Sequence, residues 1–236
     1  MIRKLESIAR LSDEEKQALQ DLPVQVTVLM ADEDIVRIGD RPSQSCVLIE
    51  GYTCVYKLTS EGKRQIMALH VPGDMPDLQS LHLKVMDNSV ATMTPCTVGF
   101  IQHEDLRRVC ERYPRITAAF WRETLVDASI FREWLLNLGR REAYDRMAHL
   151  LCELLVRLKA VGLVQDGTFD LPITQGELAD AIGASNVHVN RVLQALRADG
   201  LIRTTGSQVT ILDWEKLKEV GDFDPLYLHL VEDEAA

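Results

Sequence analysis

The segment between Thr174 and Leu212 constrains the fold of this chain more than any other part of its sequence. Thr174 and Glu177 have the spacing of a capping box, in which a hydroxyl and a carboxylate bond the free amides at a helix start. The apolar residues that follow repeat at helical intervals and predict a helix over 175–182. Gly183 adopts backbone conformations that residues with a Cβ resist, so a tight turn is expected after this helix.

A second helix and a β-hairpin complete this segment. Ser185 is a favoured capping residue for a helix over 186–198, and Asp199-Gly200 ends that helix. Residues 201–203 and 208–212 have the composition of two short strands. Two short helices joined by a glycine turn and followed by a hairpin predict a winged helix-turn-helix.

The second helix of such a motif places its N-terminal residues in the major groove of DNA. Arg191 lies on the outward face of this helix, and an arginine guanidinium can bind guanine through two hydrogen bonds. Hydroxyl, amide and N–H groups at the helix starts suit phosphates. The candidate DNA-binding residues are therefore Thr174, Gln175, Ser185, Asn186, Val187, Asn190 and Arg191. The alternative is a generic helical pair in which Arg191 is a solvated surface charge.

A net charge of −10, taken alone, opposes binding to a nucleic acid. Its distribution weakens that objection. Residues 213–236 hold eight acidic residues and two lysines, whereas residues 140–212 hold eight Lys or Arg and eight Asp or Glu. Because DNA contact depends on local patches, the total charge does not exclude a DNA partner.

The N-terminal half has a different character. Residues 3–20 are predicted to be helical, and short apolar segments separated by turn residues then follow as far as Ile101. The segments are Val24–Leu29, Ile35–Ile38, Cys46–Ile49, Val55–Leu58, Ile66–Val71, Val90–Met93 and Val98–Ile101. Many short strands at this spacing predict a β-sandwich, jelly roll or barrel.

A long helix is predicted over 115–138, after a shorter one over 103–113 that Pro114 ends. Apolar residues recur on one face of it at intervals of three or four, at Trp121, Leu125, Ala128, Phe131 and Leu135. Its opposite face is also rather apolar, so we expect one face to pack within the chain and the other to form a dimer seam. Packing within the chain alone is the alternative. Gly139 is expected to interrupt the helix as a hinge, before a further helix over 140–161.

The run from Thr174 to Ile202 resembles the helix-turn-helix signature of the Crp/Fnr family of transcription regulators, and the order of the other elements matches. The resemblance implies an α+β fold in three parts. These are a β-roll of the jelly-roll, cyclic-nucleotide-binding type over 1–113, a dimerisation helix over 114–138 and a winged helix-turn-helix domain over 139–236. It also implies a homodimer that binds double-stranded palindromic DNA and contacts RNA polymerase. Many members have Glu, which reads cytosine, where this chain has Val187, so a different target sequence is expected.

The resemblance also indicates where an effector pocket is expected. The stretch that aligns with the ribose- and phosphate-binding residues of cyclic-AMP-binding members contains Asp77, Leu78 and Ser89. Asp77 could replace the ribose acid, but no arginine lies between Arg64 and Arg107 to pair with a phosphate. We therefore expect an unidentified small effector, or none, rather than a cyclic nucleotide.

The five cysteines are scattered and contain no C-x-x-C pair, which does not favour a zinc or iron–sulfur site. They are Cys46, Cys54, Cys96, Cys110 and Cys152. Buried, inert thiols are expected, with a single redox-sensing cysteine as the alternative. His70 and His82 are the candidates for a haem ligand, although a lone histidine is more often an ordinary strand or surface residue. No cofactor and no metal site are therefore expected.

Neither an enzyme motif nor a membrane signal is present. The chain contains no phosphate-binding loop, G-x-S-x-G or H-E-x-x-H pattern, no long apolar run and no signal peptide, so a cytoplasmic non-enzyme is expected. The sequence thus predicts a dimeric DNA-binding transcription regulator. The alternative is a ligand-sensing module that acts through protein contacts and has a vestigial helix-turn-helix. The effector, the target sequence, the regulated genes and the choice between activation and repression do not follow from the sequence.

Overall fold

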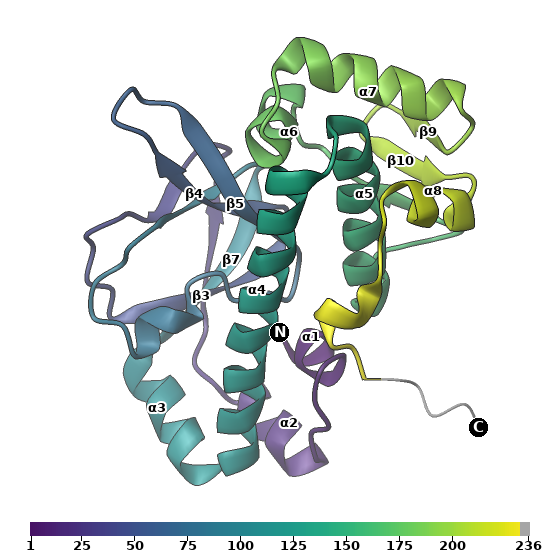
Figure 1. Ribbon diagram of the computed structural model, residues 1–236. Helices are drawn as coiled ribbons and strands as arrows, with labels where there is room; N and C mark the ends of the chain where they lie inside the picture. Colours follow the sequence, from purple (N-terminus) through teal and green to yellow (C-terminus); the bar gives the residue numbers. More distant parts are fainter. Residues whose placement is uncertain (232–236) are drawn as a thin grey trace, which may run out of the picture.

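The computed structural model describes residues 1–231 and has a β-roll, a long central helix and a C-terminal helical domain (Figure 1). The chain begins with helices α1 (Ile2–Glu6) and α2 (Asp13–Gln20). The prediction of one helical stretch over 3–20 is therefore too simple, because Ser12 starts a new helix. Its hydroxyl and the Glu15 carboxylate form a capping box around the first turn of α2.

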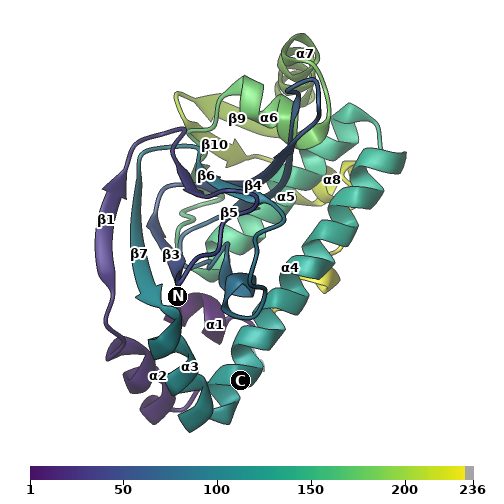
Figure 2. The ribbon, with the colours of Figure 1, turned by 90° about the vertical axis from the view of Figure 1, so that its left-hand side faces the viewer.

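Seven strands form the β-roll, and they match the seven predicted segments closely. They are β1 (Gln25–Leu29), β2 (Asp34–Val36), β3 (Gln44–Glu50), β4 (Thr53–Leu58), β5 (Arg64–His70), β6 (Ser89–Thr92) and β7 (Cys96–Gln102). They pair antiparallel in two sheets, with the orders β1-β7-β3 and β2-β6-β4-β5. In Figure 2, the first sheet lies on the outer side, and the second lies between it and the long helix. A short 3-10 helix, η1 (Leu78–Leu81), connects β5 to β6.

Helix α3 (His103–Arg112) leads into the long helix α4 (Pro114–Arg140). Val126, Ile130 and Trp134 of α4 are buried in the largest apolar core, which also includes residues of the β-roll and of the C-terminal domain. The predicted interruption at Gly139 is wrong. The helix continues through Gly139 to Arg140, and the chain bends at Arg141 and Glu142, where the backbone is extended.

The C-terminal domain begins with α5 (Ala143–Ala160), which runs beside α4 (Figure 1). The helix-turn-helix follows as α6 (Gln175–Ile182) and α7 (Asn186–Ala198). Strands β8 (Thr168–Asp170), β9 (Ile202–Thr205) and β10 (Gln208–Ile211) form the wing in the order β8-β10-β9. After the wing, α8 (Trp214–Val220) and a second 3-10 helix, η2 (Pro225–Leu228), return along α5. The sequence reasoning did not predict these last two elements, and residues 232–236 of the predicted third domain lie outside the described residues.

Candidate nucleic-acid interface

The first helix of the motif is fixed at its start by the predicted capping box. The Glu177 amide donates to the Thr174 hydroxyl at 3.2 Å, and the Thr174 amide donates to the Glu177 carboxylate at 2.8 Å. Leu178, Ala179 and Ile182 turn into the core, as the periodicity predicted. The capping box therefore fixes where α6 begins and leaves Thr174 and Gln175 exposed at its N-terminal end.

Glycine is required at the turn between the two helices. Gly183 has a φ of +64°, which is the left-handed region. A Cβ atom on this residue would also lie 2.9 Å from Cδ2 of Leu138, near the end of α4. The turn of the motif therefore packs directly against the end of the long helix.

The second helix, α7, lies at one end of the molecule (Figure 1), and its polar face is exposed. Val189, Val192 and Leu196 are buried, while Asn186, Val187 and Arg191 are exposed. Val187 is an apolar side chain that is 64% exposed at the helix start. Such exposure carries a solvation cost that contact with an apolar group would remove.

The two helices are connected by polar side chains at the same edge. The side-chain amide of Asn190 donates to the side-chain oxygen of Gln175 at 3.3 Å. A Cβ atom on Gly176 would lie 3.8 Å from Nδ2 of Asn186. The structure therefore brings Gln175, Asn186 and Asn190 together, beside the capping residues Thr174 and Ser185. The wing lies at the other end of α7, where Arg197 donates to the Thr204 hydroxyl at 3.0 Å.

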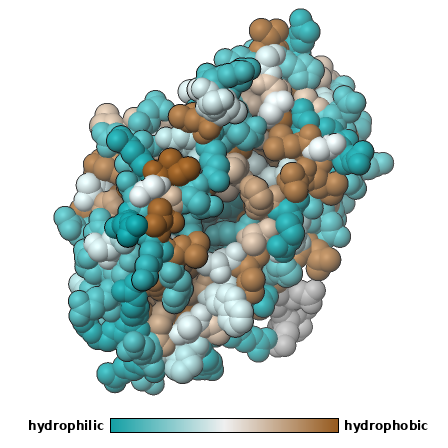
Figure 3. Space-filling view, turned by 60° about the vertical axis from the view of Figure 1, so that its left-hand side comes forward, coloured by the Kyte–Doolittle hydropathy of each residue, from teal (hydrophilic) through white to brown (hydrophobic). Residues whose placement is uncertain are grey.

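The outward face of α4 holds most of the residues that were predicted for a dimer seam. Trp121 is 69% exposed and Leu135 is 64% exposed, although both are large and apolar, and Leu125 and Phe131 are also exposed. Ala128 is half-buried between them. Figure 3 shows that hydrophobic side chains gather on the face of the molecule that the β-roll and α4 share. Contiguous apolar surface of this kind marks an interaction site.

A cavity of 340 Å³ lies beside this surface, between the β-roll and α4. Its wall includes His70, Gln79, Asp127 and Phe131, and Arg157 of α5. The three residues expected to form an effector pocket are not among the residues that line it. The Asp77 carboxylate instead accepts a hydrogen bond from the Cys46 amide at 2.8 Å, and the Ser89 hydroxyl accepts one from the Ile38 amide at 3.1 Å. Leu78 lines a different, more apolar cavity between η1, α3 and α4.

The cysteines do not provide a cluster site within the described residues. Four of them are buried and Cys110 is half-buried. Burial raises the pKa of the Cys54 and Cys152 thiols to about 12, so both are neutral thiols. In residues 1–231, no group of three His, Cys, Asp or Glu side chains is arranged to hold a metal ion. The residues present therefore do not fit an iron–sulfur cluster, which needs several close thiolates.

Comparisons with known proteins agree with this architecture. The Crp-like helix-turn-helix domain matches residues 145–220, and the cyclic nucleotide-binding domain matches residues 26–113. The chain belongs to the Crp/Fnr family of transcription regulators. It is therefore not an enzyme but a regulator with a DNA-binding helix-turn-helix domain.

Several relatives within this family match over most of their length. The transcriptional activator protein FnrL of Cereibacter sphaeroides is 27% identical over 226 residues, which cover 94% of this chain and 90% of the relative. The nitrogen fixation regulation protein FixK of Bradyrhizobium diazoefficiens is 27% identical over 168 residues, or 70% of this chain and 69% of the relative. The solved structure of FixK2 from Bradyrhizobium japonicum shares the fold, with a TM-score of 0.77, 24% identity and coverage of 84% of this chain and 98% of that one.

Contacts that sequence reasoning missed connect the C-terminal domain to the β-roll. Arg64 on β5 forms an ion pair with Asp180 on α6 at 2.8 Å. The side-chain amide of Gln65 donates to the backbone carbonyl of Asp180. Arg157 of α5 pairs with Asp74 of the β-roll at 2.7 Å. No sequence spacing indicates such pairs, because their partners lie 83 or more positions apart.

Among residues 1–231 there is also no helix long and apolar enough to cross a membrane.

Proposed function

We propose that this Crp/Fnr regulator acts as a homodimer that places two copies of α7 in successive major grooves of a two-fold-symmetric DNA site. The observation that carries the proposal is the open polar face of α7, which the capped start of α6 adjoins. In this geometry the half-sites lie one helical turn, or about 34 Å, apart. The action is proposed to take place in the cytoplasm, with RNA polymerase as a protein partner at the promoter.

The exposed side chains of α7 suggest how each half-site is read. Arg191 would bind guanine through two hydrogen bonds, and Asn186 or Asn190 would bind adenine. Val187 cannot accept a hydrogen bond from cytosine, but it would pack against a thymine methyl group. Thr174, Gln175 and Ser185 would contact phosphates, which fix the position of the helix without reading sequence.

The dimer would form along α4. Trp121, Leu125, Ala128, Phe131 and Leu135 supply its apolar face, and aromatic anchors of this kind dominate the energy of interfaces. Val126, Ile130 and Trp134 already pack within the chain, so the outward face is left for the partner helix. This division of α4 into two apolar faces supports the proposed seam.

The 340 Å³ cavity, and not the pocket expected at Asp77, Leu78 and Ser89, is the proposed site for a small effector. Its charged wall residues are Lys57, Asp87, Asp127 and Arg157, with His70 beside them. Two acids oppose a phosphate here, and the guanidinium of Arg157 is already paired with Asp74 and Glu153, so the cavity is a poor match for a phosphate. We therefore propose that neither a cyclic nucleotide nor a bound cofactor is needed.

Substitution of Arg191 tests the DNA-reading assignment. Arg191→Ala should cost about 1–3 kcal/mol of specific binding at fixed salt, which is about 5- to 150-fold in affinity. Arg108→Ala is the matched control, because Arg108 is an exposed arginine on α3, far from α7, and pairs with neighbouring Glu104 and Asp105. Equal affinity of the Arg191→Ala variant and the control for the selected site would contradict the assignment and favour a vestigial motif.

A further inference from the structure

The chain continues beyond the end of the matched helix-turn-helix domain at residue 220, and residues 221–231 form a strap along three helices. The strap begins where α8 ends, includes η2, and runs down beside α5 toward α1, as the yellow ribbon of Figure 1 shows. The strap contacts both α4 and α5, the two helices that flank the bend at Arg141.

The first residue of the strap is packed directly on α5. A Cβ on Gly221 would lie 2.7 Å from the His149 amide nitrogen and 2.9 Å from the His149 Cα. The φ of Gly221 is −75°, so glycine is needed here for close approach and not for an unusual backbone. Such close backbone contact indicates a built attachment, since loops that lie loosely on a surface leave room for a side chain.

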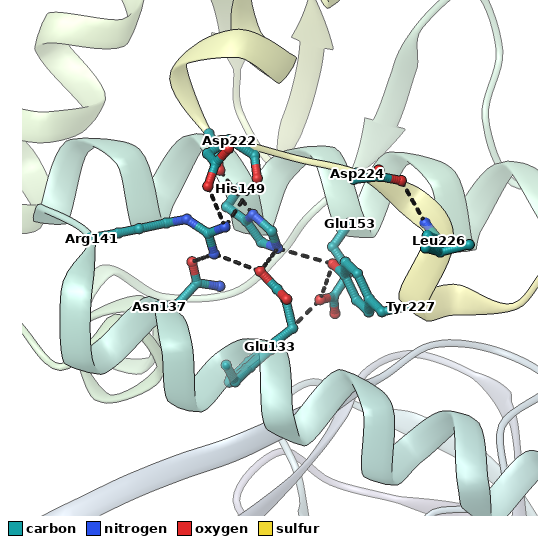
Figure 4. Close-up of polar contacts among 11 residues, drawn as sticks. Glu133, Asn137, Arg141, His149, Glu153, Asp222, Asp224, Leu226 and Tyr227 are labelled. Atoms are coloured by element: carbon teal, nitrogen blue, oxygen red, sulfur yellow. Dashed lines mark hydrogen bonds and ion pairs between the residues drawn. The ribbon is translucent and has the colours of Figure 1, made fainter.

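Buried polar groups fasten the middle of the strap to α5 (Figure 4). His149 is fully buried, with Nδ1 2.9 Å from the Gly221 carbonyl and Nε2 3.0 Å from the Tyr227 hydroxyl. The same hydroxyl donates to the Glu153 carboxylate at 2.8 Å, and Glu153 also accepts from Trp134 of α4 at 3.1 Å. Tyr227 therefore connects α5 and α4 through one carboxylate.

Further contacts tie the strap to α4 and to the N-terminus. Arg141, at the bend, donates to the Asp222 carboxylate at 2.8 Å and to Glu133 of α4 at 2.6 Å. Arg122 of α4 donates to the His229 carbonyl at 3.1 Å, and the Val231 amide donates to the Ser7 carbonyl, just after α1, at 2.7 Å.

An apolar anchor accompanies these polar contacts. Leu228 is 2% exposed and belongs to the same apolar core as Ile8, Val126 and Ile130. Leu226, two residues earlier on the same strap, is 76% exposed. The strap therefore has one buried face, which carries Leu228 and Tyr227, and one solvated face.

We propose that the strap of residues 221–231 is a built-in tie that holds the C-terminal domain at a fixed angle to α4 and to the N-terminal helix, and so sets how α7 is presented. The tie itself follows from contacts within the chain, whereas its effect on DNA rests on the proposed function. In the strapped arrangement the outward face of α7 is exposed, and under the proposed function this arrangement is the one that binds DNA. Loosening the strap lowers the fraction of molecules in it, and the apparent affinity falls by the same factor.

The test compares Leu228→Ala with Leu226→Ala in the full chain, which is the same change at a buried and at an exposed position of the strap. Tyr227→Phe is the gentler second variant, since it removes only the hydroxyl that joins His149 and Glu153. Hydrogen exchange is measured over residues 2–9 and 133–141, and affinity is measured for the selected DNA site at one salt concentration. We expect Leu228→Ala and Tyr227→Phe to exchange faster in both segments and to bind DNA about tenfold more weakly, while Leu226→Ala matches the wild type.

Unchanged exchange over 2–9 and 133–141 in both strap variants would overturn the tie. Faster exchange with unchanged DNA affinity would overturn its role in presenting α7. If the wild type itself fails to bind any DNA site, the proposed function fails, and the exchange data still decide whether the strap ties the domains.

Discussion

The guanidinium of Arg157 on α5 lies 2.7 Å from the carboxylate of Asp74 in the β-roll, and both side chains are almost fully buried. Lys4 of α1 lies 3.4 Å from the same carboxylate, and His70 lies 3.4 Å from it on the other side. Although burial opposes ionisation, Lys4 and Arg157 hold the pKa of Asp74 well below its usual range. One carboxylate therefore joins the N-terminal helix, the β-roll and the C-terminal domain.

Removal of one member of this buried pair should be costly. Arg157→Met leaves Asp74 short of one charged partner, and loss of a buried partner typically lowers the free energy of unfolding by about 3–5 kcal/mol. Lys4 and His70 remain near Asp74, but the buried Glu153 carboxylate, 3.0 Å from Arg157, also loses its partner, so we expect a loss within this range, measured by urea unfolding. Combination with Asp74→Asn should cost less than the sum of the two single changes. Additive costs would show that the two residues do not interact energetically.

The stability of the protein should depend on pH through Asp77. Burial raises the pKa of this carboxyl to about 7, although the Cys46 amide donates to it. The folded state thus keeps a proton that the unfolded chain, with its carboxyl pKa near 3.8, has lost, so the free energy of unfolding falls as pH rises from about 4 through about 7.

Asp77→Asn keeps the acceptor for Cys46 and cannot ionise. At pH 8 we expect it to be more stable than the wild type by about 4 kcal/mol, because the pKa is raised from 3.8 to about 7 and each pKa unit corresponds to roughly 1.4 kcal/mol. At pH 4 the two proteins should be alike. Asp87→Asn, at a side chain that is 73% exposed, is the control and should show no such difference. A variant that follows the wild-type pH profile would contradict the assignment to Asp77.

The two glycines at the end of α4 and in the motif should respond in opposite ways to alanine. Gly139 lies inside α4, and a Cβ added to it would meet nothing within 4 Å, so Gly139→Ala should stabilise the protein by about 0.5–1 kcal/mol. Gly183→Ala should destabilise it by more than about 1 kcal/mol, because φ is +64° and Leu138 occupies the space. Thermal unfolding measures both. If the Gly139→Ala variant is stable but binds DNA more weakly, flexibility of the backbone at Gly139 would be needed for DNA binding.

The base preference at one position of the DNA site should change with Val187. Val187→Glu introduces a carboxylate that accepts a hydrogen bond from the exocyclic amine of cytosine. Selection from random duplexes should then recover cytosine where the wild type recovers thymine, with the guanine contacted by Arg191 kept. An identical motif from both proteins would place Val187 outside the base-reading surface.

Local sequence patterns predicted the parts of the fold that depend on local chemistry. The capping box at Thr174, the glycine turn at Gly183 and the strand segments were found because each is formed by residues close together in sequence. Periodicity also placed Trp121, Leu125, Phe131 and Leu135 on one face of α4, and all four are exposed. Burial and backbone geometry determine these features, and both favour particular residue types at fixed intervals in the sequence.

Prediction from the sequence failed where distant contacts decide the outcome. Gly139 has a weak helical preference, but the rest of α4 is fixed by tertiary packing, which overrides the preference. The Asp77 side chain is buried because it accepts a hydrogen bond from the backbone amide of Cys46 on β3. The sequence spacing of the two residues does not indicate this contact. Six of the eleven strap residues are apolar, but the polar contacts that hold its helical turn at Pro225 involve His149 and Glu153, which lie 74 or more positions away from Tyr227 in the sequence.

Selection of the purified protein against random duplex DNA, with and without cyclic AMP, is the decisive test of α7 as a DNA-reading helix. We expect a two-fold-symmetric motif with half-sites about one helical turn apart, recovered equally in both conditions. A motif recovered only with cyclic AMP would contradict the proposal that no cyclic nucleotide is needed. The absence of any motif in both conditions would contradict the assignment of α7 itself.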